Sequence, residues 1–532
     1  MNRLESLRRY ARATAFTCLV GVPGVAAAQP ATPAAPPLAP PAPATPAAGE
    51  SASEPPAAPI PNPAPPSPPQ GPRAEPAVAA RAETAAPSPP PSEENKPAEP
   101  FAFGDFTWLN GSNRQHRSLL DSEIFTGSFL LDVNYTLSKN RPIDNTVVGS
   151  TALSRDDEVT LAFMGFGGDF HYKGARARLM TQFGVRSVLV PRNDFSAFRG
   201  QFDLADALRY ISEANGGVHI NALNGINVDG GIFMSYVGLF SYDNFENWMY
   251  LPSFTSDNTP WFFNGIRVQV FTSDKLKIEP WLINGWQTYG KFNEMPGFGA
   301  QVLWRPVEYF SVLSNAYVGW DTQDLPGVFR FHSDNSATIR FYNDARGGFI
   351  TRDAMSVTAD IGGQIGNGVT AFGGSGTEGH CTVQSPCTSQ FLSWMAYHRT
   401  WFGENFAFTF GGGMMHNPSR YLVLAPTGNA SGVPQNLSLQ GLSYVPPTSP
   451  YDYSPGAQFD AWDYEFGGQY MPNEEVTLDL EFNHRQASVP YFSGHGGVTS
   501  PDGYITTATP QGWRPDLVKG DDRIIAALLV RF

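Results

Sequence analysis

Two cysteines and a histidine lie together in one Gly-, Ser- and Thr-rich stretch, and their spacing suggests chemistry. Cys381 and Cys387 are close enough in sequence to form a disulfide in an oxidising compartment. His380 makes a zinc site the alternative, but zinc normally requires a second pair of ligands, and none is evident. We therefore expect a disulfide between Cys381 and Cys387, and we predict neither a metal site nor a cofactor.

A set of histidines and serines raises the possibility of an enzyme. A hydrolase needs a nucleophile, a base and a group that orients the base. The candidate bases are His398, His416, His484 and His495, and the candidate nucleophiles are Ser419 and Ser493. Their spacing supplies no arrangement of this kind. We predict that the chain is not an enzyme, with an outer-membrane barrel hydrolase kept as an alternative.

These residues must be held by extended segments, because the dominant pattern from Phe125 onward has period two. It is cleanest between 476 and 483, where apolar residues alternate with Thr477, Asp479, Glu481 and Asn483. A strand with charges on one face and only apolar groups on the other separates water from an apolar medium. Two environments fit: the core of a soluble β-sandwich, as in a surface adhesin, or lipid around a water-filled barrel.

The connections between the segments favour the barrel. Short links such as Ser273-Asp274 alternate with long ones such as 242–259 and 415–455. With antiparallel strands every long link then lies on the same side, which is typical of bacterial transmembrane barrels. We predict an all-β fold, a transmembrane antiparallel β-barrel of about 16 strands (roughly 14 to 18), in which the first strand pairs with the last. Pro280 interrupts one segment, and 206–217 is also compatible with a short helix.

The first hundred residues differ in composition from the rest. Residues 1–28 combine a basic start, an apolar run and Ala26-Ala27-Ala28, which predicts a secretory signal peptide. Residues 29–100 hold 25 of the 47 prolines and predict a Pro/Ala-rich disordered tether. Binding of this tether to the cell wall is an alternative to simple disorder. Residues 101–532 then form the barrel.

The C-terminal segment and the composition agree with an outer-membrane location. Apolar residues alternate up to the terminal Phe532, as in the signal by which barrel-assembly machinery recognises its substrates. An even number of strands places both ends, and the tether, in the periplasm of a Gram-negative bacterium. Residues 101–532 carry a net charge of −13, which argues against a nucleic-acid partner. Tryptophans are expected at the lipid boundaries, namely Trp108, Trp281, Trp286, Trp304, Trp320, Trp394 and Trp401.

Three stretches resemble the beta-barrel porin family, type 2, of Gram-negative outer membranes. They are YVGLFSYDNFENW (236–248), TPWFFNGIRV (259–268) and EPWLINGWQ (279–287), and DVNY (132–135) with NRP (140–142) resembles the family's opening strand and first loop. The similarity covers most of 124–320. It implies an outer-membrane porin that lets small hydrophilic solutes or ions diffuse through an aqueous lumen, and it names no particular solute. Many wide porins are trimers, so a homotrimer is a further expectation.

A barrel of this size encloses water, so inward-facing charges are candidate pore-lining residues. On the alternation these are Asp132, Asp229, Asp360, Asp479, Glu481, Arg176, Arg178, Arg267 and Arg340. The third long link, 242–259, is the candidate constriction, with Asp243, Glu246 and Asp257 as its acids. We hypothesise that these acids face a basic wall across the narrowest point. The net charge then suggests a mild preference for cations.

Overall fold

The computed structural model describes residues 99–532, except 119, 151, 192–193, 195, 197–199, 292, 322–325, 345, 376–381, 419–458 and 500–514. The predicted signal peptide and all but the last two residues of the predicted tether lie outside the described residues.

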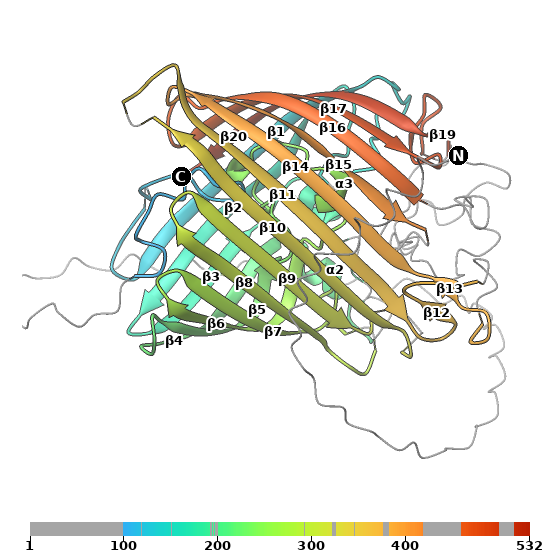
Figure 1. Ribbon diagram of the computed structural model, residues 1–532, viewed down its shortest axis with the longest axis horizontal. Coiled ribbons are helices and arrows are strands. Elements are labelled where there is room, and N and C mark those ends of the chain that lie inside the picture. Colours follow the sequence, from blue (N-terminus) through green and yellow to red (C-terminus); the bar gives the residue numbers. More distant parts are fainter. Residues whose placement is uncertain are drawn as a thin grey trace, which may run out of the picture. The chain divides into compact units, whose positions relative to one another are not determined.

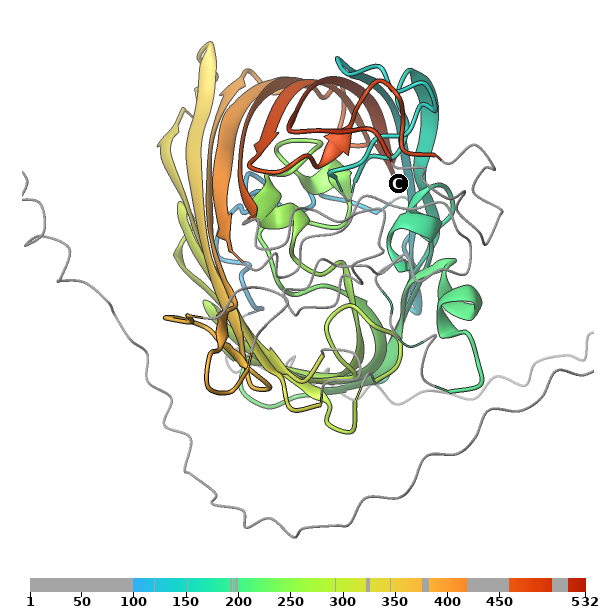
Figure 2. The same ribbon diagram turned by 90° about the vertical axis from the view of Figure 1, so that its right-hand side faces the viewer.

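Within the described residues, sixteen strands form one closed antiparallel barrel, seen from the side in Figure 1 and turned by 90° in Figure 2. The strands are β1 (Phe125–Ser138), β2 (Glu158–Tyr172), β3 (Ala175–Thr181), β4 (Ile211–Ile220), β5 (Ile226–Met234), β6 (Phe262–Ser273), β7 (Leu276–Ile283), β8 (Gly297–Val307), β9 (Phe310–Gly319), β10 (Phe329–Asn343), β11 (Ile350–Ile365), β14 (Gln390–Phe402), β15 (Phe406–Asn417), β16 (Phe459–Tyr470), β17 (Val476–Ala487) and β20 (Gly520–Arg531). Neighbours in sequence pair with each other, and β1 pairs with β20 from Leu130–Arg531 to Ser138–Arg523. The predicted strand number and closure are confirmed.

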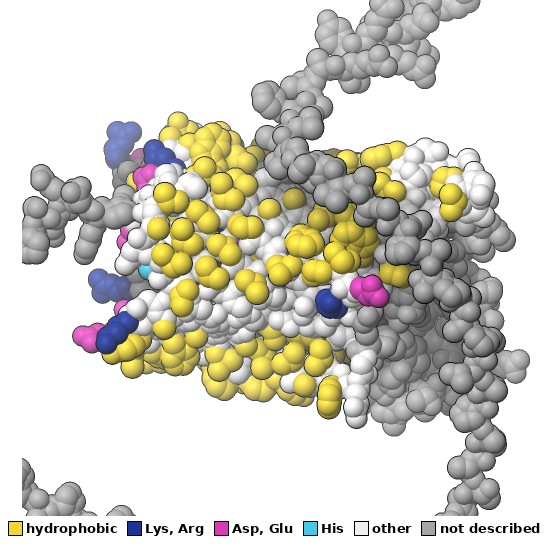
Figure 3. Space-filling model, turned by 90° about the horizontal axis from the view of Figure 1, so that it is seen from below, with side chains coloured by type: hydrophobic (Ala, Val, Ile, Leu, Met, Phe, Trp, Pro, Cys, Tyr) yellow, Lys and Arg dark blue, Asp and Glu magenta, His cyan; other side chains and the backbone are white. Residues whose placement is uncertain are grey.

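The period-two pattern separates an apolar outside from a polar inside. In β17, Leu478 and Leu480 are 46% and 61% exposed, whereas Asp479 and Glu481 are 6% and 1% exposed. Figure 3 shows one face of the barrel, on which hydrophobic side chains cover the strands and most of the charged ones gather at one end. This arrangement suits a barrel whose outer surface contacts hydrocarbon.

The remaining elements are short and belong to the connections. They are the helices α1 (Arg186–Leu189), α2 (Leu204–Leu208) and α3 (Phe254–Asp257), the 3-10 turn η3 (Asn244–Glu246), and two small sheets, β12 (Val369–Thr370) with β13 (Cys387–Thr388) and β18 (Phe492–Ser493) with β19 (Leu517–Val518). No helix in the described part of the chain has the length and apolar character of a membrane span.

Two expectations about local structure need correction. The segment 206–217 is not a helix: α2 ends at Leu208, and β4 begins at Ile211. Pro280 lies within β7, paired with Ala300 of β8, while the ladder between β6 and β7 omits the pairs at Val268 and Gln269. Proline has no backbone N–H to donate to β6, so β7 accommodates Pro280 where its pairing with β6 is interrupted.

The tryptophans divide between the two faces. Trp304 and Trp394 are exposed on the outside, as a lipid-boundary girdle requires. Trp108, Trp281, Trp286 and Trp401 are instead buried in clusters of apolar side chains. For these four the girdle expectation is wrong, because segments inside the barrel supply them with an apolar environment.

The connections alternate as predicted. Short turns such as 274–275, 308–309 and 403–405 lie at one end, called here the turn end, and the long connections lie at the other. The third long connection, residues 235–261 between β5 and β6, is called loop 3.

Candidate functional site

Loop 3 is folded into the barrel. Figure 2 shows it, with α3, inside the ring of strands and close to β16 and β17. Its backbone donates to side chains on the inner wall: Phe254 N to Asp463 Oδ2 at 2.6 Å and Ser253 N to the Tyr397 hydroxyl at 2.9 Å. Tyr250 N donates to Glu481 Oε2 at 2.8 Å. The wall of β14, β16 and β17 therefore satisfies backbone groups that a buried loop would otherwise leave unpaired.

Three predicted pore-lining acids lie between this loop and the wall. Asp132 of β1 accepts hydrogen bonds from the Tyr250 hydroxyl at 2.8 Å and from Asn244 Nδ2 at 3.0 Å. Glu481 accepts from the loop backbone, and Asp479 accepts from Gln469 Nε2 at 2.7 Å. All three carboxylates face inward, but the loop covers them.

The acids of loop 3 meet arginines on the same wall. Asp257 pairs with Arg485 of β17, and both side chains are almost fully buried. Glu246 pairs with Arg531 of β20, and Asp243 lies 3.8 Å from the same guanidinium. Burial, and then the charge of Glu246, raise the pKa of Asp243 to about 6. The surface of the inner wall that loop 3 contacts is called here the seat of the loop. The predicted acids meet basic residues at this seat, not across an open gap.

Apolar packing completes the seat. Ile525 and Leu529 on the inner face of β20 form one buried cluster with Phe245 and Leu251 of loop 3. Sequence reasoning missed these residues. The available signal was β20 itself, which reads IIAALLV and is therefore apolar on both faces.

A segment before β1, residues 99–118, crosses the turn end and is called here the N-terminal strap. Phe101 N donates to Asp274 O at 2.7 Å, and Trp108 Nε1 to Glu308 O at 3.2 Å, at two turns of the barrel. On the other side, Gln115 Nε2 donates to Arg531 O at 2.9 Å. Between these points the strap is hydrogen-bonded to loop 3, because Trp248 N donates to Asn110 Oδ1 at 2.7 Å.

The wall formed by β2 to β6 carries a set of charged side chains, some of which remain partly exposed. Asp229 accepts from Arg267 Nε at 3.2 Å, and Arg176 Nε lies 3.3 Å from Asp229 Oδ1 as an ion pair. Arg178 pairs with Asp169 at 2.6 Å and also with Glu213. The side chains of Arg176 and Arg178 are 35% and 21% exposed, whereas that of Arg485 beneath loop 3 is 0% exposed. Four of the predicted lining residues thus share one charged wall.

The last two predicted lining residues lie on β10 and β11. Arg340 donates to Glu308 at 2.9 Å, and its guanidinium lies 5.2 Å from the ring of Trp108 in the strap. Asp360 is buried opposite Asp334 in the ladder, with His332 Nε2 at 3.7 Å.

The described residues among those considered for other chemistry bond to different parts of the chain. Cys387 takes part in a disulfide, while Cys381, His380 and Ser419 lie outside the described residues. Ser493 donates its hydroxyl to Thr146 O at 2.5 Å, and His484 contacts Asp522 at 2.5 Å. Among the residues that the structure places, no group of three or more His, Cys, Asp or Glu could hold a metal ion.

Comparison with known proteins identifies a family. The family model described as "beta-barrel porin-2, OmpL-like" matches residues 125–509. No curated protein matches the sequence.

Solved structures of similar fold include the outer membrane channel DcaP of Acinetobacter baumannii, at 11% identity and a TM-score of 0.42, covering 78% of this chain and 100% of that one. An anion-selective porin from Comamonas acidovorans is 10% identical, with a TM-score of 0.41 and coverage of 77% and 99%. OmpT of Vibrio cholerae, in its trimer form, is 9% identical, with a TM-score of 0.40 and coverage of 77% and 100%.

Proposed function

Because the chain belongs to the beta-barrel porin-2, OmpL-like family, its barrel is an outer-membrane diffusion channel, and we propose that small hydrophilic solutes and ions pass beside loop 3. The observation that carries this route is the difference in side-chain exposure between two parts of the inner wall. Residues 244–257 of loop 3 bond to β1, β14, β16, β17 and β20, whereas the side chains of Arg176 and Arg178 on β3 remain 35% and 21% exposed.

Further along the same route, a cavity of about 210 Å³ continues between the strap, the first part of loop 3 and the wall of β8 to β10. On the wall side it is lined by polar groups, among them Gln301, Ser311 and Thr338. Polar side chains that replace part of a solute's hydration are what a diffusion channel requires. The same features favour a channel over the hydrolase and adhesin alternatives.

We propose only weak charge selectivity. On the exposed wall each guanidinium has a carboxylate partner, as in the pairs of Arg178 with Asp169 and of Arg267 with Asp229. Paired charges largely cancel beyond a Debye length of about 8 Å at physiological salt. The net charge of −13 on residues 101–532 then leaves a mild preference for cations.

The test is a planar bilayer recording with the mature protein. We expect stepwise ohmic conductance in KCl and a small reversal potential of cation-selective sign in a KCl gradient. Liposome swelling with sugars of increasing size measures the width of the route. Absence of conductance from a protein that shows a heat-dependent shift in gel mobility would refute the channel.

The placement of the chain ends and the assembly partners are further proposals. Phe532 joins the barrel seam through reciprocal backbone bonds with Phe129, at 2.8 and 2.9 Å, which supports a role for this residue in assembly. Deleting it should lower the yield of folded barrel. A tether in the periplasm that contacts the cell wall, and a homotrimer, are tested by protease access in intact cells and by crosslinking in membranes.

A further inference from the structure

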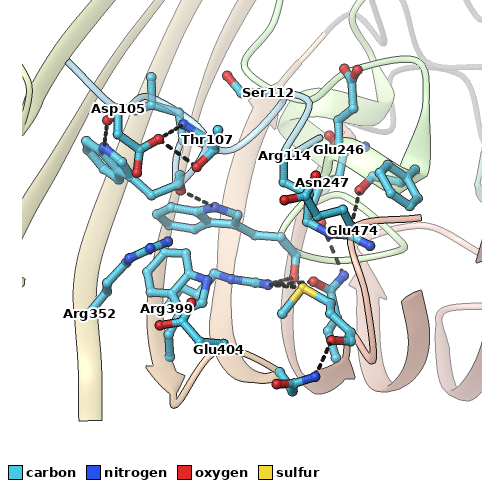
Figure 4. A pocket seen from close by; sticks show the side chains of 18 of the residues that line it. Asp105, Thr107, Ser112, Arg114, Glu246, Asn247, Arg352, Arg399, Glu404 and Glu474 are labelled. Carbon is cyan, nitrogen blue, oxygen red and sulfur yellow. Dashed lines mark hydrogen bonds between the residues drawn. The ribbon is translucent and has the colours of Figure 1, made fainter. Parts of the chain in front are cut away.

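A second cavity, of about 350 Å³, lies at the turn end (Figure 4). The N-terminal strap forms one side, the tip of loop 3 another, and the ends of β11, β14 and β16 the third. The strap and the loop tip are joined here by hydrogen bonds from Trp248 N to Asn110 Oδ1 and from Trp248 Nε1 to Trp108 O. The cavity is therefore built by three parts of the chain that are distant in sequence.

Three guanidinium groups line this cavity, those of Arg114, Arg352 and Arg399. On other parts of the inner wall, Arg178, Arg267 and Arg485 are ion-paired. In contrast, none of the three arginines of the cavity forms an ion pair with any residue that the structure describes.

Two of these arginines are held by neutral acceptors. Arg399 donates to Trp248 O at 3.0 Å and to Gln469 Oε1 at 2.7 Å, while its Nε has no hydrogen-bond partner among the described residues. Arg114 donates to Val476 O at 2.9 Å. Burial lowers the pKa of Arg114 to about 10, so it keeps its charge at neutral pH.

Arg352 is the least engaged of the three. Its side chain makes no hydrogen bond to any described residue, and Figure 4 shows this side chain reaching into the cavity from β11. Trp401, which also lines the cavity, packs edge-on against Trp248 with ring centroids 5.7 Å apart. The Arg399 guanidinium lies 5.0 Å from the centre of the Trp401 ring, so the cavity offers both charged and apolar contacts.

The carboxylates in the lining are mostly engaged by protein groups. Glu246 pairs with Arg531, and Glu474 accepts from His116 N at 3.0 Å and contacts its Nδ1 at 2.7 Å. Asp105 accepts from Thr107 N at 2.9 Å and from Thr107 Oγ1 at 2.7 Å. Three of the four carboxylates in the lining thus have hydrogen-bond partners, whereas the Arg352 side chain has none among the described residues.

We propose that this cavity binds a small organic carboxylate, with the Arg352 guanidinium receiving the carboxylate and the aromatic side chains contacting the rest of the molecule. Arginine presents two parallel N–H groups that match the two oxygens of a carboxylate. The cavity volume lies at the lower end of the range for ligand pockets, which suits a compact, ring-bearing anion. The site rests on the proposed function, because it would act on solutes that pass through the channel.

Benzoate is the probe, with benzamide as the uncharged control of the same shape. Binding to the detergent-solubilised full-length mature protein is measured by titration calorimetry, and block of KCl current is measured in planar bilayers. Arg352→Gln is compared with Arg346→Gln at the β10–β11 turn. Arg346 is at the same end of the barrel, and its side chain is 96% exposed.

We expect benzoate to bind and to reduce the current, and benzamide to do neither at the same concentration. Arg352→Gln should weaken benzoate binding by about tenfold or more, as expected for a lost charged hydrogen bond. Arg352→Lys should give an intermediate affinity, and Arg346→Gln should leave it unchanged. KCl conductance without benzoate should persist in every variant.

Several results would overturn the site. They are no heat of binding for benzoate, equal effects of Arg352→Gln and Arg346→Gln, or equal binding of benzamide. Normal KCl conductance combined with any of these results removes this inference alone. Loss of KCl conductance from the unsubstituted protein removes the proposed channel instead, while calorimetry still reports whether the cavity binds.

Discussion

Replacing Asp257 by alanine should release loop 3 from its seat. The Arg485 guanidinium is fully buried and would retain only backbone acceptors, including Gly149 O at 3.0 Å. Removing one partner of a buried ion pair costs about 3 to 5 kcal/mol. Because about 1.4 kcal/mol is a factor of ten, the ratio of seated to unseated loop should fall by roughly 100-fold or more. Asp257→Asn keeps an acceptor for Arg485, so it should cost less, on the order of 1 to 2 kcal/mol.

The assay combines single-channel recording with limited proteolysis in detergent. We expect Asp257→Ala to give noisier current and faster cleavage within loop 3, with Asp257→Asn in between. The matched control is Asp206→Ala, which removes an exposed pair with Arg209 in another long connection. Exposed pairs contribute about 0 to 1 kcal/mol, so this variant should match the unsubstituted protein. Equal noise and equal cleavage for Asp257→Ala and Asp206→Ala would refute the anchoring argument.

Three further predictions concern pH, the lipid face and the strap. The raised pKa of Asp243 means that its ionised form is disfavoured where loop 3 contacts the wall. Loop 3 should therefore be held more tightly, and cleaved more slowly by protease, as pH falls from 7 through about 6. Asp243→Asn should abolish this pH dependence of loop cleavage. Leu480→Arg places a charge on the exposed outer face of β17 and should lower folding stability in lipid vesicles by about 2 to 4 kcal/mol, measured by urea titration. Trp108→Ala removes a buried side chain and its bond to Glu308 O, which should loosen the strap and raise single-channel conductance; unchanged conductance would exclude the strap from the solute route.

The barrel could be predicted because its signal is local. Successive side chains of each strand must face lipid and water in turn, and the sequence shows this alternation directly, as in Leu480 and Glu481. The parity of long and short connections is also a local property, and it correctly placed loop 3 as the third long connection.

The site could be predicted only in part, because alternation gives the direction of a side chain and not what covers it. Asp132 and Asp229 look alike in sequence, yet Asp132 receives hydrogen bonds from loop 3 and Asp229 lies in a ladder with Arg176 and Arg267. The difference comes from a loop that is more than a hundred residues away from Asp132. The position of the strap could not be predicted from the sequence either, since its contacts with residues 274, 308 and 531 join distant parts of the chain.

The seat of loop 3 also bears on how the barrel closes. The closing seam joins β1 to β20, and the loop contacts both strands, through Asn134 Nδ2 to the Tyr250 hydroxyl at 2.7 Å and through Glu246 to Arg531. A loop that bonds to both sides of a seam is seated only when the seam is closed, so seating and closure stabilise each other. The apolar inner face of β20 follows from this coupling, because Ile525 and Leu529 pack against the loop and not against water. In this barrel the last strand is therefore adapted to the inserted loop as much as to the lipid.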